Sequence, residues 1–282
     1  MYFQGPYTPQ GWHARSDTLI HHRVTSVMTQ QPAISIEFRD VVYRIAADRL
    51  LLDGINLGVQ PGETLMLLGR SGSGKTTCLK MINRLIEPTS GEVLVDGKAV
   101  SQWDIIRLRR SIGYAIQDVG LFPHYSVCEN VGLIPKLEGW ERARLDARVA
   151  EVLTLVGLPL REFGDRYPNQ LSGGQRQRVG LARALAAEPP ILLMDEPFGA
   201  LDPITRAEVQ MEFQKLQLRL KKTVVFVTHD VGEALMLGDR IGLMDSGRLR
   251  GVYTADEFWQ ANDELAKAYK QVVQAGQQRL GN

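Results

Sequence analysis

The stretch TLMLLGRSGSGKTTCLKMINRLI, residues 64–86, decides the fold of this chain. TLMLL is typical of a fully buried strand, and KTTCLKMINRLI predicts a helix with an apolar stripe. The glycine-rich loop between them matches the pattern G-x-x-x-x-G-K-[ST], and a strand before it and a helix after it are the context that this pattern requires. Glycines let backbone N–H groups approach phosphates closely, and a helix N-terminus adds partial positive charge. We therefore predict a phosphate-binding loop; the alternative is a glycine-rich turn with an exposed lysine.

The loop predicts roles for two of its side chains. Lys75 would reach the β- and γ-phosphates of a nucleotide such as ATP, and the hydroxyl of Thr76 would bind Mg²⁺. The residues predicted to bind ATP are those of the whole loop: Gly69, Arg70, Ser71, Gly72, Ser73, Gly74, Lys75, Thr76 and Thr77.

Outward from the loop, buried strands alternate with helices. ILLMD, TVVFVTH and RIGLMD read as further buried strands, and helical segments separate them. This alternation predicts an α/β fold with a mostly parallel sheet. Residues 119–171 differ, because they are charged, helical and amphipathic, so we expect a helical subdomain inserted into the main fold.

Composition limits the classes of partner that the chain can have. The net charge is +1, which argues against a nucleic-acid partner, and no apolar run approaches the ~20 residues that cross a bilayer. The two cysteines, Cys78 and Cys128, have no metal-ligand spacing. Residues 1–32 are polar and irregular, which predicts a disordered lead-in, and their YFQG resembles the remnant of a cleavable tag. Residues 251–282 predict a helical tail.

Two carboxylates follow the strand ILLMD. Asp195 ends that strand, where ligands bind in parallel sheets, and it can hold Mg²⁺ through a water. Glu196 comes next and can act as general base for the attacking water. The alternative for Glu196 is a solvated loop acid.

Two further polar residues are candidates for catalysis. His229 leaves the strand TVVFVT and can contact the γ-phosphate; the alternative is a structural residue at a strand end. Gln117 follows RRSIGYAI and can bind Mg²⁺ or position water, and the alternative is an ordinary polar loop residue.

A second glycine-rich helix start, LSGGQ at residues 171–175, raises the question of what it binds. Ser172 and Gln175 fit a capping box, so the segment can simply begin a helix. Capping needs no glycine pair, however, and two glycines in a first turn cost about 1 kcal/mol each relative to alanine. One loop already holds this subunit's triphosphate, so we predict that LSGGQ meets the ATP of a second subunit.

These motifs occur in the order seen in ATP-binding cassette (ABC) ATPases, which the chain resembles over about residues 34–250. The resemblance implies a P-loop NTPase (RecA-like) fold, with an antiparallel β portion and a helical subdomain, as an ABC ATPase domain over residues 33–250. It also implies two copies stacked head to tail around ATP, with Asp202 coupling the two sites. The residues that would close over the partner's ATP are Ser172, Gly173, Gly174 and Gln175.

The resemblance extends to one branch of the family. VGLIPKLEGW, DRYPNQ and GALDPITR are similar to segments of the cassette subunits of importers for osmoprotectants such as glycine betaine, choline and carnitine. That branch implies that the chain binds transmembrane permease subunits and, through them, works with a substrate-binding protein. It also implies a peripheral position on the cytoplasmic face of the inner membrane. We expect the permease contact in the helical insert and in the loop after Gln117. The adenine-stacking aromatic of the family aligns with Ile45 or Ala46, and Tyr43, on the same strand face as Ile45, is the nearest candidate.

Three alternatives share part of the pattern. An ABC exporter or lipid transporter would use the same motifs. A soluble ABC protein acting on ribosomes or DNA would carry two cassettes in one chain or a long coiled coil, and neither is visible. A P-loop small-molecule kinase would explain Lys75 but would leave LSGGQ and His229 without a role.

Overall fold

The structure is a computed structural model that describes residues 36–46, 49–116, 119–199 and 201–280, with side chains up to residue 275. These residues belong to one compact unit, Pro32–Asn282. The predictions for the lead-in 1–32 and for Gln117 lie outside the described residues.

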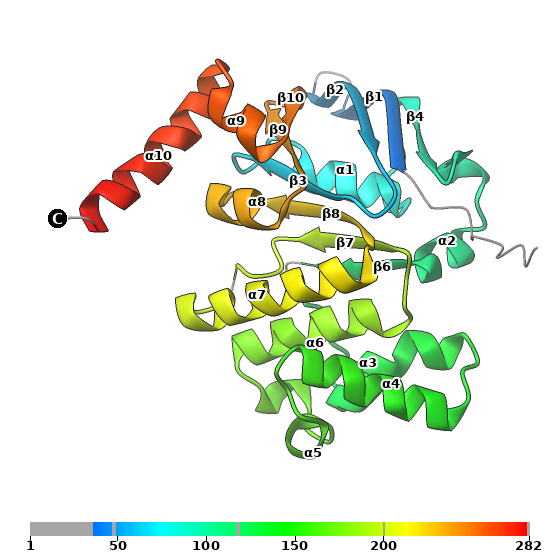
Figure 1. Cartoon of the computed structure of the whole chain (residues 1–282). Helices are drawn as coiled ribbons and strands as arrows, with labels where there is room; N and C mark the ends of the chain where they lie inside the picture. The colour runs from blue at the N-terminus through cyan, green and yellow to red at the C-terminus, as the bar shows by residue number, and fades with distance from the viewer. Residues whose placement is uncertain (1–35, 47–48, 117–118, 200, 281–282) are drawn as a thin grey trace, which may run out of the picture. The chain divides into compact units, whose positions relative to one another are not determined.

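A six-stranded sheet forms the centre of this unit (Figure 1). Its order is β10–β9–β3–β8–β7–β6; the pairs from β9 to β6 are parallel, and β10 is antiparallel to β9. The strands are β3 (Thr64–Gly69), β6 (Ile112–Ala115), β7 (Ile191–Asp195), β8 (Thr223–Thr228), β9 (Arg240–Asp245) and β10 (Arg248–Tyr253). The predicted mostly parallel α/β sheet is confirmed.

The central strands are buried on both faces, which explains why their sequences are continuously apolar. Along β3, Leu65 and Leu67 belong to one hydrophobic cluster, whereas Met66 and Leu68 belong to another. Successive side chains of a strand point to opposite faces, so each cluster packs on one face of the sheet.

A smaller antiparallel sheet covers one of these faces together with α1 (Lys75–Ile82). Its order is β2–β1–β4–β5, and its strands are β1 (Ile36–Ala46), β2 (Arg49–Val59), β4 (Ser90–Val95) and β5 (Lys98–Ala99). The antiparallel portion implied by the family resemblance is therefore present.

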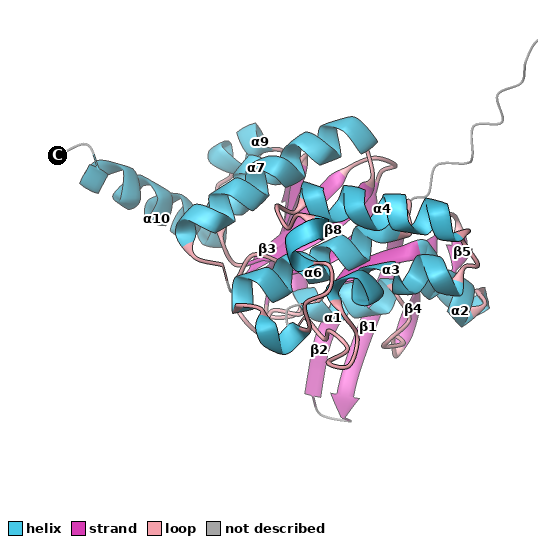
Figure 2. Ribbon diagram, turned by 90° about the horizontal axis from the view of Figure 1, so that it is seen from below, coloured by secondary structure: helices cyan, strands magenta, loops and turns pink. Residues whose placement is uncertain are grey.

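Most other helices pack on the opposite face of the central sheet. Between β6 and β7, α3 and α4 pack with α6, and α5 packs with α4. Figure 2 shows α3, α4 and α6 lying together over the sheet. The helices are α2 (Ile105–Ser111), α3 (Val127–Leu137), α4 (Arg142–Leu155), α5 (Leu160–Phe163), α6 (Gly173–Ala186), α7 (Pro203–Leu220), α8 (Val231–Leu237), α9 (Ala255–Gln260) and α10 (Glu264–Leu280), with short 3₁₀ turns at Val100–Gln102 and Pro168–Gln170.

Among the elements that differ from the sequence-based expectations are β10 and α2. The strand β10 extends through Tyr253, so the first residues of the expected tail belong to the sheet, and α2 was not predicted. Both are short and carry exposed positions, which weakens their periodicity. Among the described helices, none combines the length and the apolar character that crossing a bilayer demands.

Candidate nucleotide-binding site

The glycine-rich loop, Glu196 and His229 line one cavity of about 710 Å³. The loop contributes all of its predicted residues except Gly69 and Ser73, and two residues outside the predicted set, Leu51 and Tyr269, complete the lining. The structure thus brings together the phosphate-binding loop and two of the three predicted catalytic residues.

The loop needs its glycines at two points. Gly72 and Gly74 have φ angles of 78° and 101°, which side chains rarely tolerate. Gly74 also precedes the first turn of α1, where an added Cβ would lie 2.5 Å from Leu52 Cδ2. The backbone therefore passes tightly from β3 into α1, and the N–H groups of the first turn stay free for an anion.

Lys75 is buried and bonded to its own loop. Its Nζ donates to the carbonyl oxygens of Gly69 at 2.8 Å and Arg70 at 2.9 Å. Burial lowers the pKa of Lys75, and the nearby carboxylates of Glu196 and Asp195 oppose that effect. The ammonium is thus held at the loop by weak neutral acceptors that phosphate oxygens can replace.

Two of the three predicted magnesium ligands, Thr76 and Asp195, are in contact. The hydroxyl of Thr76 donates to Oδ1 of Asp195 at 2.8 Å, and Asp195 is 4% exposed. Burial raises the pKa of Asp195, although the hydrogen bond from Thr76 counteracts it. A hydroxyl and a carboxylate are oxygen donors, which Mg²⁺ prefers, so the residues fit the ion.

Glu196 and His229 face each other across neighbouring strand ends. β7 ends at Asp195 and β8 at Thr228, and the two strands are parallel neighbours. His229 Nδ1 lies 3.2 Å from Glu196 Oε2. Glu196 adopts a φ of 46°, an unusual left-handed conformation for a residue with a side chain, and its N–H donates to the carbonyl of Val227 at 3.1 Å. This strained turn directs the carboxylate toward the cavity.

The LSGGQ segment lies apart from this cavity. Ser172 caps α6: its Oγ accepts from the N–H of Gln175 at 3.2 Å, and Gln175 Oε1 accepts from the N–H of Ser172 at 2.9 Å. Gly173 and Gly174 form the first turn of the helix. None of these residues lines the cavity around the glycine-rich loop. The capping box is therefore present, and the structure does not bring LSGGQ to the subunit's own loop.

Asp202 caps α7. Its Oδ1 accepts from the N–H of Thr205 at 3.1 Å, and a hydrogen bond from the Thr205 side chain holds the pKa of Asp202 below its usual value. Asp202 also lies outside the cavity.

The cavity contains a different tyrosine from the one that the sequence indicated. Tyr43 on β1 is half-buried against the hydrophobic cluster beside the antiparallel sheet and does not line the cavity, whereas Ile45 is 52% exposed. Tyr269 of α10 does line it. Sequence reasoning missed Tyr269 because α10 carries only an amphipathic pattern and no motif.

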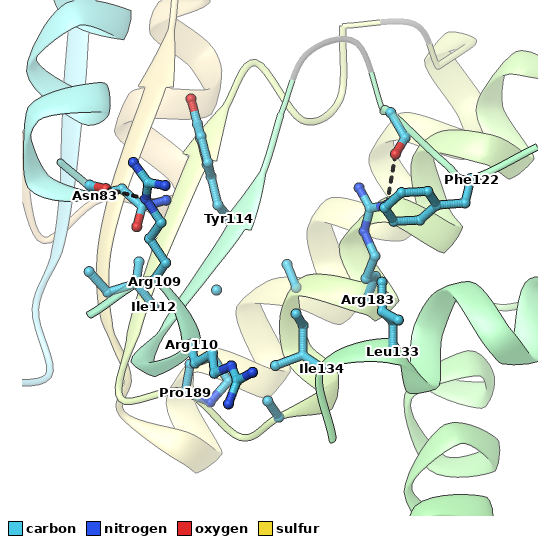
Figure 3. Close-up of a pocket in the computed structure, with 14 residues that line it drawn as sticks. Asn83, Arg109, Arg110, Ile112, Tyr114, Phe122, Leu133, Ile134, Arg183 and Pro189 are labelled. Atoms are coloured by element: carbon cyan, nitrogen blue, oxygen red, sulfur yellow. Dashed lines mark hydrogen bonds between the residues drawn. The ribbon is translucent and has the colours of Figure 1, made fainter. Parts of the chain in front are cut away.

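A second cavity, of about 340 Å³, lies between the central sheet and the helices inserted after β6 (Figure 3). Arg183 of α6 donates to the carbonyl oxygens of Val119 at 2.6 Å and Gly120 at 2.8 Å, so it holds the segment that follows Gln117. The lining residues are Asn83, Arg109, Arg110, Ile112, Gly113, Tyr114, Gly120, Phe122, Leu133, Ile134, Arg183, Ala184, Ala187 and Pro189.

This geometry agrees with sequence comparison. The profile of the family described as "ABC transporter" matches residues 52–199. The "Osmoprotectant import ATP-binding protein OsmV" of Salmonella typhimurium (strain LT2) is 52% identical over 207 residues, which are 73% of this chain and 54% of that protein. The "Glycine betaine uptake system ATP-binding protein YehX" of Escherichia coli (strain K12) is 52% identical over 214 residues, 76% of this chain and 69% of that protein. The chain spans about half the length of several such relatives.

Solved structures share the fold. A structure described as "Dimeric structure of a post-hydrolysis state of the ATP-binding cassette MJ0796 bound to ADP and Pi" has a TM-score of 0.72 and 36% identity, covering 78% of this chain and 98% of that chain. A "bacterial Atm1-family ABC exporter with ATP bound" has the same TM-score at 27% identity, covering 85% of this chain and 42% of the exporter chain.

Proposed function

The chain belongs to the ABC transporter family, and from this premise we propose that it is the ATP-hydrolysing subunit of an importer for quaternary-amine osmoprotectants. The observation that carries the proposal is the cavity in which the glycine-rich loop faces the Glu196–His229 pair. The loop supplies phosphate binding, and the pair supplies a base beside it.

In the proposed reaction, Lys75 exchanges its bonds to the Gly69 and Arg70 carbonyls for bonds to the phosphates of ATP. Thr76 and Asp195 would hold Mg²⁺, which when bound would neutralise charge on the phosphate oxygens. Glu196 accepts a proton from water as the water oxygen attacks the γ-phosphorus. The bond from that phosphorus to the bridging oxygen breaks, and ADP and phosphate leave. His229 orients Glu196 and the γ-phosphate.

The proposed working unit is a head-to-tail dimer. Ser172 to Gln175 present a helix N-terminus that can cover the ATP of a second copy, since helix N-termini attract phosphate. Asp202, at the start of α7, would couple the two sites. The family relative with a dimeric ADP and phosphate complex supports this arrangement.

The proposed permease contact is the second cavity. Its lining combines apolar side chains with three arginines. The helices α2 and α3, which contribute to this lining, also carry well exposed apolar residues, Ile106 at 56% and Leu137 at 53%. An exposed apolar surface with a polar rim is typical of a protein interface. Partnership with a permease places the subunit at the cytoplasmic face of the inner membrane.

The proposed cargo rests on the relatives, whose names specify osmoprotectants, glycine betaine, carnitine and choline. An exporter subunit is the alternative, and the exporter in the comparison is less similar, at 27% identity.

The test is reconstitution of the subunit in proteoliposomes with its genomically neighbouring permease and binding protein. Uptake of labelled glycine betaine, choline or carnitine should require ATP and fail with Lys75→Ala. If an amino acid or lipid is moved instead, the cargo is wrong and the ATPase role stands; absence of ATP hydrolysis would refute the whole proposal.

A further inference from the structure

The C-terminal helix α10 is fastened beside the nucleotide cavity. Asp263 caps it, with Oδ1 accepting from the N–H groups of Leu265 at 2.9 Å and Ala266 at 3.2 Å. Lys270 Nζ donates to the carbonyl oxygens of Trp259 at 3.1 Å and Ala261 at 2.7 Å. Ala266 is completely buried. These contacts lie on both sides of Tyr269 in the sequence, so they determine where this side chain is placed.

Tyr269 is the one tyrosine in the described lining of the cavity. Its ring packs at the edge of the hydrophobic cluster that also receives Leu265 and Val273. Burial raises the pKa of the Tyr269 phenol, and the charge of Arg70 acts on it in the opposite direction. The phenol therefore keeps its proton at neutral pH and can donate it in a hydrogen bond.

Arg70 and Tyr269 line the same cavity, so the position of Arg70 indicates which part of a nucleotide lies near Tyr269. Arg70 directly follows β3 and opens the loop, on the side where Lys75 Nζ is bonded to the loop carbonyls. That end of the loop receives phosphates rather than the base. A neutral O–H donor at this point suits a phosphate oxygen.

We propose that Tyr269 is a nucleotide-binding residue whose hydroxyl donates to the phosphate chain held by the glycine-rich loop. This inference rests on the proposed function and deepens it. It makes α10, which lies outside the segment matched by the family profile, part of the nucleotide site. Occupancy of the site and the position of α10 are then linked, because one hydrogen bond joins them.

The test compares Tyr269→Phe, which removes only the hydroxyl, with the matched control Tyr253→Phe. Tyr253 lies on β10, packs edge-on against Phe258 and does not line the cavity. Affinities for MgATP and for inorganic tripolyphosphate are measured on the isolated subunit by competition with a fluorescent nucleotide. Tyr269→Phe should weaken the binding of both ligands by the same factor, roughly 10- to 150-fold, as expected for a hydrogen bond to a charged group. Tyr253→Phe should match the wild type.

Several results would overturn the inference. Unchanged affinity of Tyr269→Phe for both ligands would remove the hydroxyl contact. If Tyr269→Phe weakened the affinity for MgATP but not for tripolyphosphate, the ring would contact the base instead. The same would follow if only Tyr269→Ala, and not Tyr269→Phe, lowered the affinity for MgATP. If the wild-type protein bound neither ligand, the proposed function itself would be refuted. If wild type and Tyr269→Phe both bound normally, only the inference about Tyr269 would be refuted.

Discussion

Glu196 carries both the strain and the proposed chemistry of the site. Its φ of 46° costs a side-chain-bearing residue on the order of 1–3 kcal/mol, and glycine would relieve that cost. Glycine has no carboxylate, however. The strain is therefore consistent with a residue retained for its reaction rather than for stability.

Replacing Glu196 with Gln should separate binding from hydrolysis. The amide keeps the size of the side chain but cannot accept a proton, so MgATP affinity should stay near the wild-type value while kcat falls by ~10²-fold or more. Steady-state ATPase assays and nucleotide titration measure the two quantities. His229→Ala should also bind ATP and turn over slowly. Near-normal turnover of Glu196→Gln would exclude Glu196 as the base.

The buried, ionised carboxylate of Asp195 should lower the free energy of unfolding when no nucleotide is bound. Burial raises its folded-state pKa above the ordinary 3.8, so the folded state keeps this proton to higher pH than the unfolded state, and stability falls as the pH rises through that window. Asp195→Asn removes the cost and can still accept from Thr76. Without ligand at pH 7 its Tm should exceed that of the wild type by a few degrees, and the gain should vanish below pH 3.8.

With MgATP bound, the order of the stabilising effects on wild type and Asp195→Asn should reverse. Ligand that binds only the folded state stabilises it, so MgATP should raise the Tm of the wild type more than that of the variant. Equal Tm values at pH 7 without ligand would contradict the electrostatic account.

At the scale of elements, the sequence predicted those features whose contacts join residues close together in the chain. The strand β3, the loop and α1 follow directly from residues 64–86, and the capping box of α6 follows from Ser172 and Gln175. Each depends on contacts between residues a few positions apart, which a sequence displays.

Contacts between residues far apart in the sequence could not be predicted. Arg183 reaches the carbonyl of Val119, 64 residues earlier, and Tyr269 reaches a cavity formed by residues near position 70. Tyr43 sits on a strand with register shifts on both sides of it, so strict alternation did not apply there. These features depend on tertiary packing, for which the sequence carries no local signal.

Ser172 allows helix capping and phosphate binding to be separated. Ser172→Asp keeps a good cap but adds a negative charge where the partner's phosphates would lie, so the Tm should stay near wild type while the ATPase activity of the dimer falls at least ~10-fold. Ser172→Ala should lose about 1 kcal/mol of stability yet retain more activity than Ser172→Asp. Thermal melts and steady-state ATPase assays check both.

The reverse order of activities would mean that Ser172 acts only as a cap. Mixing Ser172→Asp with Lys75→Ala chains adds a control, because such heterodimers have one composite site intact and should regain part of the activity.

At the scale of the molecule, the proposed function gives the two cavities separate tasks in separate regions. The first is built on the strand ends of the central sheet, and the second lies where the inserted helices meet that sheet. Chemistry and coupling to a permease should therefore be separable by mutation.

Phe122, at 41% exposure, tests that separation at the second cavity. Phe122→Ser should reduce permease-stimulated ATPase activity by roughly 10-fold or more, because interface aromatics often dominate binding, while MgATP affinity of the isolated subunit stays unchanged. Leu218→Ser, on α7 at 74% exposure, is the matched control away from this cavity. Equal stimulation in both variants would place the permease elsewhere.

The insertion of α3 to α5 after β6 has an evolutionary consequence. β6 is the last strand of the central sheet, so these helices leave from an edge and return through α6 without interrupting any strand pairing. The block α3 to α5 can therefore vary in sequence and length without changing the pairing of the strands that carry the phosphate-binding loop and Glu196.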